Sequence, residues 1–282
     1  MNFPAVAYLM SDNLLKNLSE ILPAQENKMP VLFVGHGSPM NAIEENNFTA
    51  AWKQVARTIP KPLAILFISA HWLTRGSFVT AMQKPKTIHD FAGFPAELFA
   101  VEYPAPGSPE LAAYVKKIIT GNRVEEDHEW GLDHGSWSVA KKMFPEAEIP
   151  CIQLSIDYFK PASYHYELAG ELASLRKKGV LIIGSGNMVH NLRLTDFTKP
   201  DNGYDWAIEM NDLLISKIKK RDHQAMIGYE NLGTQAKLAI PTPDHYYPLM
   251  YSLGLQDSEE PVEIFNDKPS YGSITMTSVK IG

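Results

Sequence analysis

Three short apolar runs in this 282-residue chain each lead into small residues and then a histidine. The runs are residues 31–34, 63–68 and 180–183. Near-continuous apolar runs of this length are typical of parallel strands that are covered on both faces. The pattern predicts an α/β fold, with a single domain whose mostly parallel central sheet is flanked by helices.

The histidines that follow these runs are His36, His71 and His190. Parallel strands end at one edge of a sheet, and open α/β folds bind ligands at that edge. If the first two strands are parallel neighbours, their imidazoles meet there. A single histidine in such a place is more often structural than functional, but three in the same context favour a metal site at the carboxyl edge. Metal sites need neutral imidazoles held by rigid elements.

Two further histidines lie in comparable contexts, His134 beside a glycine and His245 after Thr242, Pro243 and Asp244. These three residues predict a helix start, which places His245 in the first turn. A helix N-terminus disfavours the imidazolium and favours the neutral ring that a metal requires. His134 has the simpler alternative of a surface loop residue.

The spacing of apolar residues, together with residues typical of helix and strand ends, predicts where the other helices and strands lie. Helices are predicted at 48–59, 108–120, 161–178, 204–220 and 242–253, and strands at 77–82, 124–127, 149–156 and 273–279. The glycine-rich segment 184–191 fits neither a dinucleotide fingerprint nor a phosphate-binding loop, and it lacks the spacing of a nucleophile elbow.

The loop 87–95 contains Phe91 and Phe94, which would be costly to expose to water. It either covers a pocket or folds onto a small core of its own, and His89 follows whichever alternative holds. The single cysteine, Cys151, lies in an apolar run, so we expect an inert core thiol.

The net charge, the length of the apolar runs and the cysteine count argue against several classes of protein. The net charge is −6 without any basic run, which argues against a nucleic-acid partner. No apolar run reaches the roughly 20 residues of a membrane helix, and no signal peptide is evident. One cysteine suits a reducing compartment, so a cytoplasmic protein is expected. Residues 1–29 are predicted to be an N-terminal appendage, with a short helix carrying Leu14, Leu15, Leu18 and Leu22, and residues 30–282 to be the single domain that carries the strand-end histidines.

Six motifs together resemble the class III extradiol ring-cleavage dioxygenases, and within them the DOPA 4,5-dioxygenase branch. They occur in the family's order and span about residues 30 to 282. They are Gly35-His-Gly-Ser-Pro-Met40, Ser69-Ala-His-Trp72, Ile88-His-Asp-Phe-x-Gly-Phe-Pro95, Asp133-His-Gly-Ser-Trp137, Ser185-Gly-Asn-x-Val-His-Asn-Leu192 and Pro243-x-His-Tyr-x-Pro-Leu249.

The resemblance implies one divalent metal at the strand ends, bound by His36, His71 and His245, with His190 close enough to join. His245 stands where the wider superfamily has a glutamate ligand, so a site of neutral ligands could hold Zn(II) as readily as Fe(II). His134 and His190 match the family's acid–base pair.

The function implied is insertion of O2 into a catechol such as DOPA, giving a ring-opened semialdehyde. The loop 87–95 and Trp72 are expected to pack against the ring. Two alternatives stay open at this stage: a zinc hydrolase that uses the same histidines, and a metal-binding protein without turnover. A monomer or small homo-oligomer is expected, with no nucleic acid or membrane partner.

Overall fold

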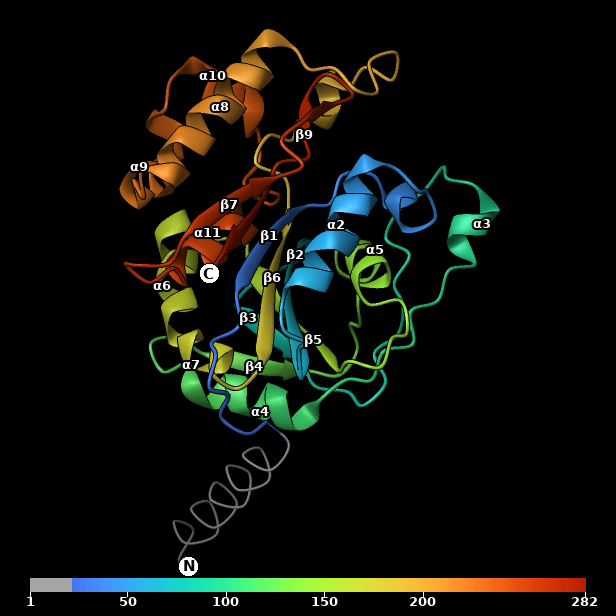
Figure 1. Ribbon diagram of the computed structural model, residues 1–282, viewed down its shortest axis with the longest axis vertical. Coiled ribbons are helices and arrows are strands. Elements are labelled where there is room, and N and C mark those ends of the chain that lie inside the picture. The colour runs from blue at the N-terminus through green and yellow to red at the C-terminus, as the bar shows by residue number, and fades with distance from the viewer. Residues whose placement is uncertain (1–21) are drawn as a thin grey trace, which may run out of the picture.

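The computed structural model describes residues 22–282, which form an eight-stranded sheet with helices on both faces (Figure 1). The strand order is β4-β3-β5-β2-β6-β1-β10-β7. Their bounds are β1 (Val31–Gly35), β2 (Ala64–Thr74), β3 (Ser77–Thr80), β4 (Val124–Asp127), β5 (Cys151–Asp157), β6 (Val180–Gly186), β7 (Val262–Phe265) and β10 (Ser278–Ile281). A separate small sheet pairs β8 (Pro269–Ser270) with β9 (Ile274–Thr275).

The four central strands, β5, β2, β6 and β1, are mutually parallel, whereas β10 and β7 join antiparallel at one side. On the other side β3 is antiparallel to β5 and parallel to β4. The predicted α/β fold with a mostly parallel central sheet is therefore confirmed. Because parallel strands bury both faces, the central runs are apolar throughout.

Alternate residues of β1 enter two different cores, as the two-residue period of a strand requires. Val31 and Phe33 pack with α4, α6, α8 and α11, while Leu32 and Val34 pack with α2 and α5. The helices are α2 (Asn47–Thr58), α3 (Ala96–Phe99), α4 (Pro109–Ile118), α5 (His134–Met143), α6 (Ala162–Glu171), α7 (Ala173–Arg176), α8 (Asp205–Lys219), α9 (His223–Ile227), α10 (Thr234–Ala239) and α11 (Tyr247–Gly254). Within residues 22–282, no helix combines the length and the apolar content needed to cross a bilayer.

Several predicted boundaries differ from the structure. Strand β2 continues through His71 to Thr74, and its pairing with β5 shifts register between Ile68 and Leu73. The helix expected at 161–178 is two helices that meet at Leu172. The strand expected at 273–279 is divided between β9 and β10. Residues 221–241, for which no element was predicted, contain α9, η3 (Tyr229–Asn231) and α10.

Residues 22–29 pack onto the domain. Leu22 is buried in the core that contains α4 and α6, and Met29 is buried in the core on the other face. The backbone carbonyl of Met29 accepts a hydrogen bond of 2.7 Å from Nε of Arg176, a buried side chain in α7. The predicted helix that carries Leu14, Leu15 and Leu18 lies outside the described residues, and the boundary at residue 30 stays a prediction.

Candidate metal centre

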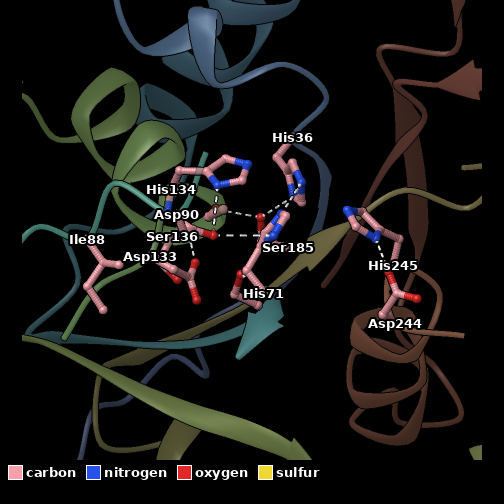
Figure 2. A network of polar contacts seen from close by, with 12 residues as sticks. His36, His71, Ile88, Asp90, Asp133, His134, Ser136, Ser185, Asp244 and His245 are labelled. Atoms are coloured by element: carbon pink, nitrogen blue, oxygen red, sulfur yellow. Dashed lines mark hydrogen bonds and ion pairs between the residues drawn. The ribbon is translucent and has the colours of Figure 1, made fainter. Parts of the chain in front are cut away.

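Three of the predicted ligands come together at the carboxyl edge of the sheet (Figure 2). His36 directly follows β1, and His71 lies within β2. His245 lies in a turn just before α11, which begins at Tyr247 and not at residue 242, so the predicted place of His245 in the first turn of a helix is wrong. One nitrogen of each ring lies within 4.8 Å of the others. The first two strands are not neighbours as considered above, because β6 lies between them.

Glycines allow the His245 turn to approach the strand ends. A Cβ at Gly186, the last residue of β6, would lie 2.1 Å from the carbonyl oxygen of His245. Because Gly186 has no Cβ, that carbonyl can approach the strand and accept a hydrogen bond of 2.9 Å from the backbone N–H of Asn187. The segment Gly184-Ser-Gly-Asn187 therefore makes room for a ligand-bearing turn, since only glycine permits so close an approach.

Hydrogen bonds fix the tautomers of His36 and His245. The hydroxyl of Ser185 donates to the carbonyl of Gly135 at 2.6 Å, so it accepts from Nδ1 of His36, 3.0 Å away. Nδ1 of His245 likewise donates to a carboxylate oxygen of Asp244. With the proton on Nδ1 in both rings, Nε2 is left with a free lone pair, which is the form that binds a metal.

The carboxylate of Asp90 lies close to the imidazoles of both His134 and His71. Its Oδ2 lies 3.0 Å from Nδ1 of His134 and 3.4 Å from Nδ1 of His71, and its Oδ1 accepts from the backbone N–H of His134 at 2.9 Å. Burial opposes ionisation of Asp90, but the contacts with His134 and His71 keep the pKa of its carboxyl below the ordinary value. A carboxylate here favours the Nδ1–H form of both histidines.

The distance between His36 and His71 fits a shared metal ion. Their Nε2 atoms lie 3.1 Å apart, and the tautomers above place a lone pair on each. Two facing lone pairs repel each other unless a cation lies between them. Two imidazole nitrogens at about 2.0–2.1 Å from one ion are about 2.8–3.4 Å apart for angles between 90° and 109°.

The rings are kept neutral by their surroundings. Burial, followed by the neighbouring histidines, holds the pKa values of His36 and His245 well below the ordinary 6.5. Burial and His134 lower the pKa of His71 to about 3. Burial lowers the pKa of His190 to about 4, against the opposing effect of Asp244. Neutral imidazoles at neutral pH are what a metal site requires.

His134 and His190 lie beside this trio. His134 is the first residue of α5, with Asp133 as the helix cap, and it is buried, so it is not a surface loop residue. His190 stacks on His245, with ring centroids 3.5 Å apart. One of its nitrogens groups with Asp244 and His245, and not with His36 and His71.

The histidines open into a cavity of about 400 Å³, a size typical of small-molecule sites. Beyond the five histidines and Asp90, its wall is mostly apolar. The remaining lining residues are Gly37, Ser38, Pro39, Met40, Phe91, Phe94, Leu192, Thr195, Phe197, Ser270, Tyr271 and Ile274.

The expectations for the aromatic residues are only partly confirmed. Phe91 and Phe94 line the cavity and also pack against the core beneath, so both alternatives for the loop 87–95 hold in part. Trp72 does not line the cavity and stacks on Trp130 instead, so its predicted contact with substrate is wrong. His89 bonds the carbonyl of Val101 at 2.9 Å, which is a structural role.

Sequence reasoning did not identify Asp90, Asp244 and Ser185 as the partners of the ligands. Asp244 adjoins His245 in sequence, and a carboxylate next to a candidate ligand is a usable signal. Asp90 and Ser185 lie far from their partners along the chain, so spacing could not reveal them.

A buried cluster of neutral histidines at the edge of a parallel sheet defines a metalloenzyme. The family model described as the catalytic LigB subunit of aromatic ring-opening dioxygenase matches residues 30–282. The chain belongs to this family, and it is a metal-dependent extradiol dioxygenase.

Curated relatives agree over most of the chain. The "4,5-DOPA dioxygenase extradiol" of Escherichia coli K12 is 46% identical over 261 residues, covering 90% of this chain and 95% of the relative. The protein of the same name from Beta vulgaris is 36% identical over 269 residues, covering 90% and 99%. A crystal structure of an uncharacterized protein from Escherichia coli K12 superposes with a TM-score of 0.79 at 42% identity, covering 90% of this chain and 100% of the other. The zinc hydrolase and the non-catalytic binder are not supported.

Proposed function

We propose that the enzyme cleaves the ring of DOPA or a closely related catechol by extradiol insertion of O2, using Fe(II). The observation that carries this proposal is the trio of His36, His71 and His245 at the floor of a mostly apolar cavity. The names of the curated relatives support DOPA as the substrate. The single buried cysteine is consistent with a cytoplasmic setting.

In this proposal His36, His71 and His245 hold the metal through Nε2. Bound Fe(II) supplies the redox chemistry that joins dioxygen to the catechol ring, which Zn(II), without redox activity, cannot supply. Three neutral ligands accept either metal, so metal identity decides whether the site turns over.

His134 is assigned as the base that deprotonates a catechol hydroxyl. Its Nδ1 faces Asp90, so Nε2 is the atom left to accept the proton. The Asp90 carboxylate then stabilises the imidazolium that forms, much as a carboxylate supports a histidine base in other enzymes. His190, which stacks on His245, is assigned as the second proton-transfer group.

Phe91 and Phe94 pack against the substrate ring and exclude water. Both line the cavity, and their rings form an edge-to-face pair with centroids 5.4 Å apart. A loop anchored to the core beneath provides a fixed wall, which holds the ring near the histidines.

Oxygen uptake tests the proposal directly. Protein freed of metal and reloaded anaerobically with Fe(II) should consume O2 when L-DOPA is added and form a semialdehyde that absorbs in the visible range. The same protein loaded with Zn(II) is the matched control and should consume none. Iron-loaded protein that binds metal fully but consumes no oxygen with any catechol would contradict the proposal.

A further inference from the structure

A second cavity of about 650 Å³ adjoins the metal pocket. The two share Ser38, Ser270 and Tyr271 as lining residues. The outer cavity is formed by residues that follow β1, by the start of α2, by the segment around Asp201 and by β8 with its flanks. Its remaining lining residues are Asn41, Glu44, Asn46, Asn47, Phe48, Pro200, Asp201, Lys268 and Met276.

The two cavities differ in the charges they offer. Among the described residues that line the metal pocket there is no lysine or arginine, and its one carboxylate, Asp90, is engaged with two histidines. The outer cavity has charges of both signs, with Lys268 facing the same space as Asp201 and Glu44. Within the described part of the chain, these three side chains form no ion pair or hydrogen bond with another residue.

Backbone hydrogen bonds around Tyr271 connect the chain segments that line the two cavities. Tyr271 has φ of 50°, a left-handed conformation that is unfavourable for a side chain of this size. Its carbonyl accepts from the backbone N–H of Asp196 at 2.9 Å, and the hydroxyl of Ser270 donates to the carbonyl of Pro200 at 3.2 Å. These bonds connect β8 to the segment that carries Asp201, so Lys268 and Asp201 lie in two connected segments that line the same cavity.

We propose that the outer cavity binds the amino-acid end of the substrate, with Lys268 on the carboxylate and Asp201, aided by Glu44, on the ammonium. This inference rests on the proposed function and extends it, because the metal pocket alone has no free group to pair with a zwitterion. A catechol ring held at the histidines would direct its side chain past Ser38, Ser270 and Tyr271. Lys268, Asp201 and Glu44 are exposed, so selectivity here comes from attraction to the substrate's charged groups, which analogues that lack those groups cannot gain.

Four catechols separate the contributions of the two charges. L-DOPA carries both groups, dopamine only the ammonium, 3-(3,4-dihydroxyphenyl)propionate only the carboxylate, and 4-methylcatechol neither. For each, kcat/KM is measured by oxygen uptake with iron-loaded protein and divided by the value for 4-methylcatechol. This ratio cancels any general loss of metal or folding.

Lys268→Gln should lower the ratio at least about ten-fold for L-DOPA and for the propionate, because charge-assisted hydrogen bonds are about twice as strong as neutral ones. Asp201→Asn should lower it comparably for L-DOPA and dopamine. The loss should appear in KM rather than kcat, because the contact is remote from the reacting atoms and is made equally in the ground and transition states. Lys219→Gln and Asp212→Asn, at exposed positions of α8, are matched controls.

A change smaller than ten-fold in either variant, or an equal loss for all four compounds, would overturn the inference and leave Lys268 as a solvated surface residue. Calorimetric binding of L-DOPA and 4-methylcatechol to zinc-loaded protein gives the same ratio without turnover. If no catechol is cleaved but wild type prefers L-DOPA in binding and Lys268→Gln does not, the proposed reaction fails while the outer cavity assignment stands.

Discussion

The imidazole of His190 lies parallel to that of His245, with 3.5 Å between ring centroids and 10° between ring planes. Two stacked rings present their nitrogens side by side, so one ion cannot lie in the plane of both at normal bond lengths. His245 has its Nδ1 occupied by Asp244 and directs Nε2 toward His36 and His71. This geometry favours His245 over His190 as the third ligand of the proposed metal site and is consistent with the proposed proton-transfer role of His190.

His190→Phe should therefore keep the metal, since phenylalanine preserves the stacked ring, whereas His245→Ala should lose it. Metal content after dialysis, measured by elemental analysis, distinguishes the two variants. Circular dichroism confirms that each is folded. If His190→Phe binds as little metal as His245→Ala, then His190 is a ligand and its ring moves when the ion binds.

Asp90→Asn should weaken metal binding. The amide replaces the carboxylate that faces Nδ1 of His71 at 3.4 Å, and partners of metal-bound histidines typically contribute about 10–100-fold in affinity or activity. Competition with a chromophoric chelator measures the change. Asp244→Asn is the matched variant on the other ligand and should behave alike, while Asp212→Asn on α8 should retain wild-type affinity.

His134→Phe should retain metal and still bind catechol but turn over about 10²–10⁴-fold more slowly, the usual contribution of a general base. The comparison is made at saturating Fe(II), with substrate binding followed separately under anaerobic conditions. Turnover equal to wild type would show that His134 is structural and that proton transfer belongs to His190.

The buried imidazole of His165 should make the folded, metal-free protein less stable as the pH falls. The ring is fully buried, Nδ1 lies 3.1 Å from the hydroxyl of Tyr251, and Nε2 has no hydrogen-bond partner among residues 22–282. Burial lowers its pKa from 6.5 to about 3. Below pH 6.5 the unfolded chain therefore takes up a proton that the folded chain does not, and stability falls as the pH falls toward 3.

Urea unfolding between pH 6 and 4 measures this effect. His165→Phe should make the slope of unfolding free energy against pH shallower by up to about 1.4 kcal/mol per pH unit, the value for one proton. His128→Gln, at an exposed position, should leave the slope as in wild type. Parallel slopes for wild type and His165→Phe would rule out His165 as the source.

Leu22→Ala should destabilise the fold by about 2–5 kcal/mol without reducing turnover, because Leu22 is buried in the core and does not line the metal pocket. A chain that begins at Met29 should lose at least as much stability. Leu238→Ala, at a position that is 42% exposed, is the control. Unchanged urea midpoints would instead support the prediction that residues 1–29 are a dispensable appendage.

The elements that were predicted correctly are those whose local pattern decides their structure. Apolar runs made β1, β2 and β6 recognisable because parallel strands bury both faces. Ser108 and Pro109 marked the start of α4, where the Ser108 hydroxyl accepts from the backbone N–H of Leu111 at 3.2 Å. His36 and His245 could be nominated because glycine or a cap residue adjoins each one.

Long-range features could not be read from local pattern. The position of β6 between β1 and β2 depends on the whole topology, and so does the bond that links Ser185 to His36. The apolar run 63–68 ends before His71, so local pattern predicts that this residue follows its strand, yet pairing with β5 and β6 holds the segment in β2 through a change of register. His190 is positioned by its bridge to Ile274, near the other end of the chain.

The place of β1 in the sheet has a consequence for the order in which the enzyme is assembled during synthesis. Among the described residues, β1 pairs with β6 and β10, so this early strand has no partner until residues 180–186 and then 278–281 have left the ribosome. At about 5–20 residues per second, a delay of many seconds separates His36 from His245. A site that requires both His36 and His245 can therefore form only after residue 245 has been synthesised, so metal binding by the proposed trio must follow the synthesis of most of the described fold.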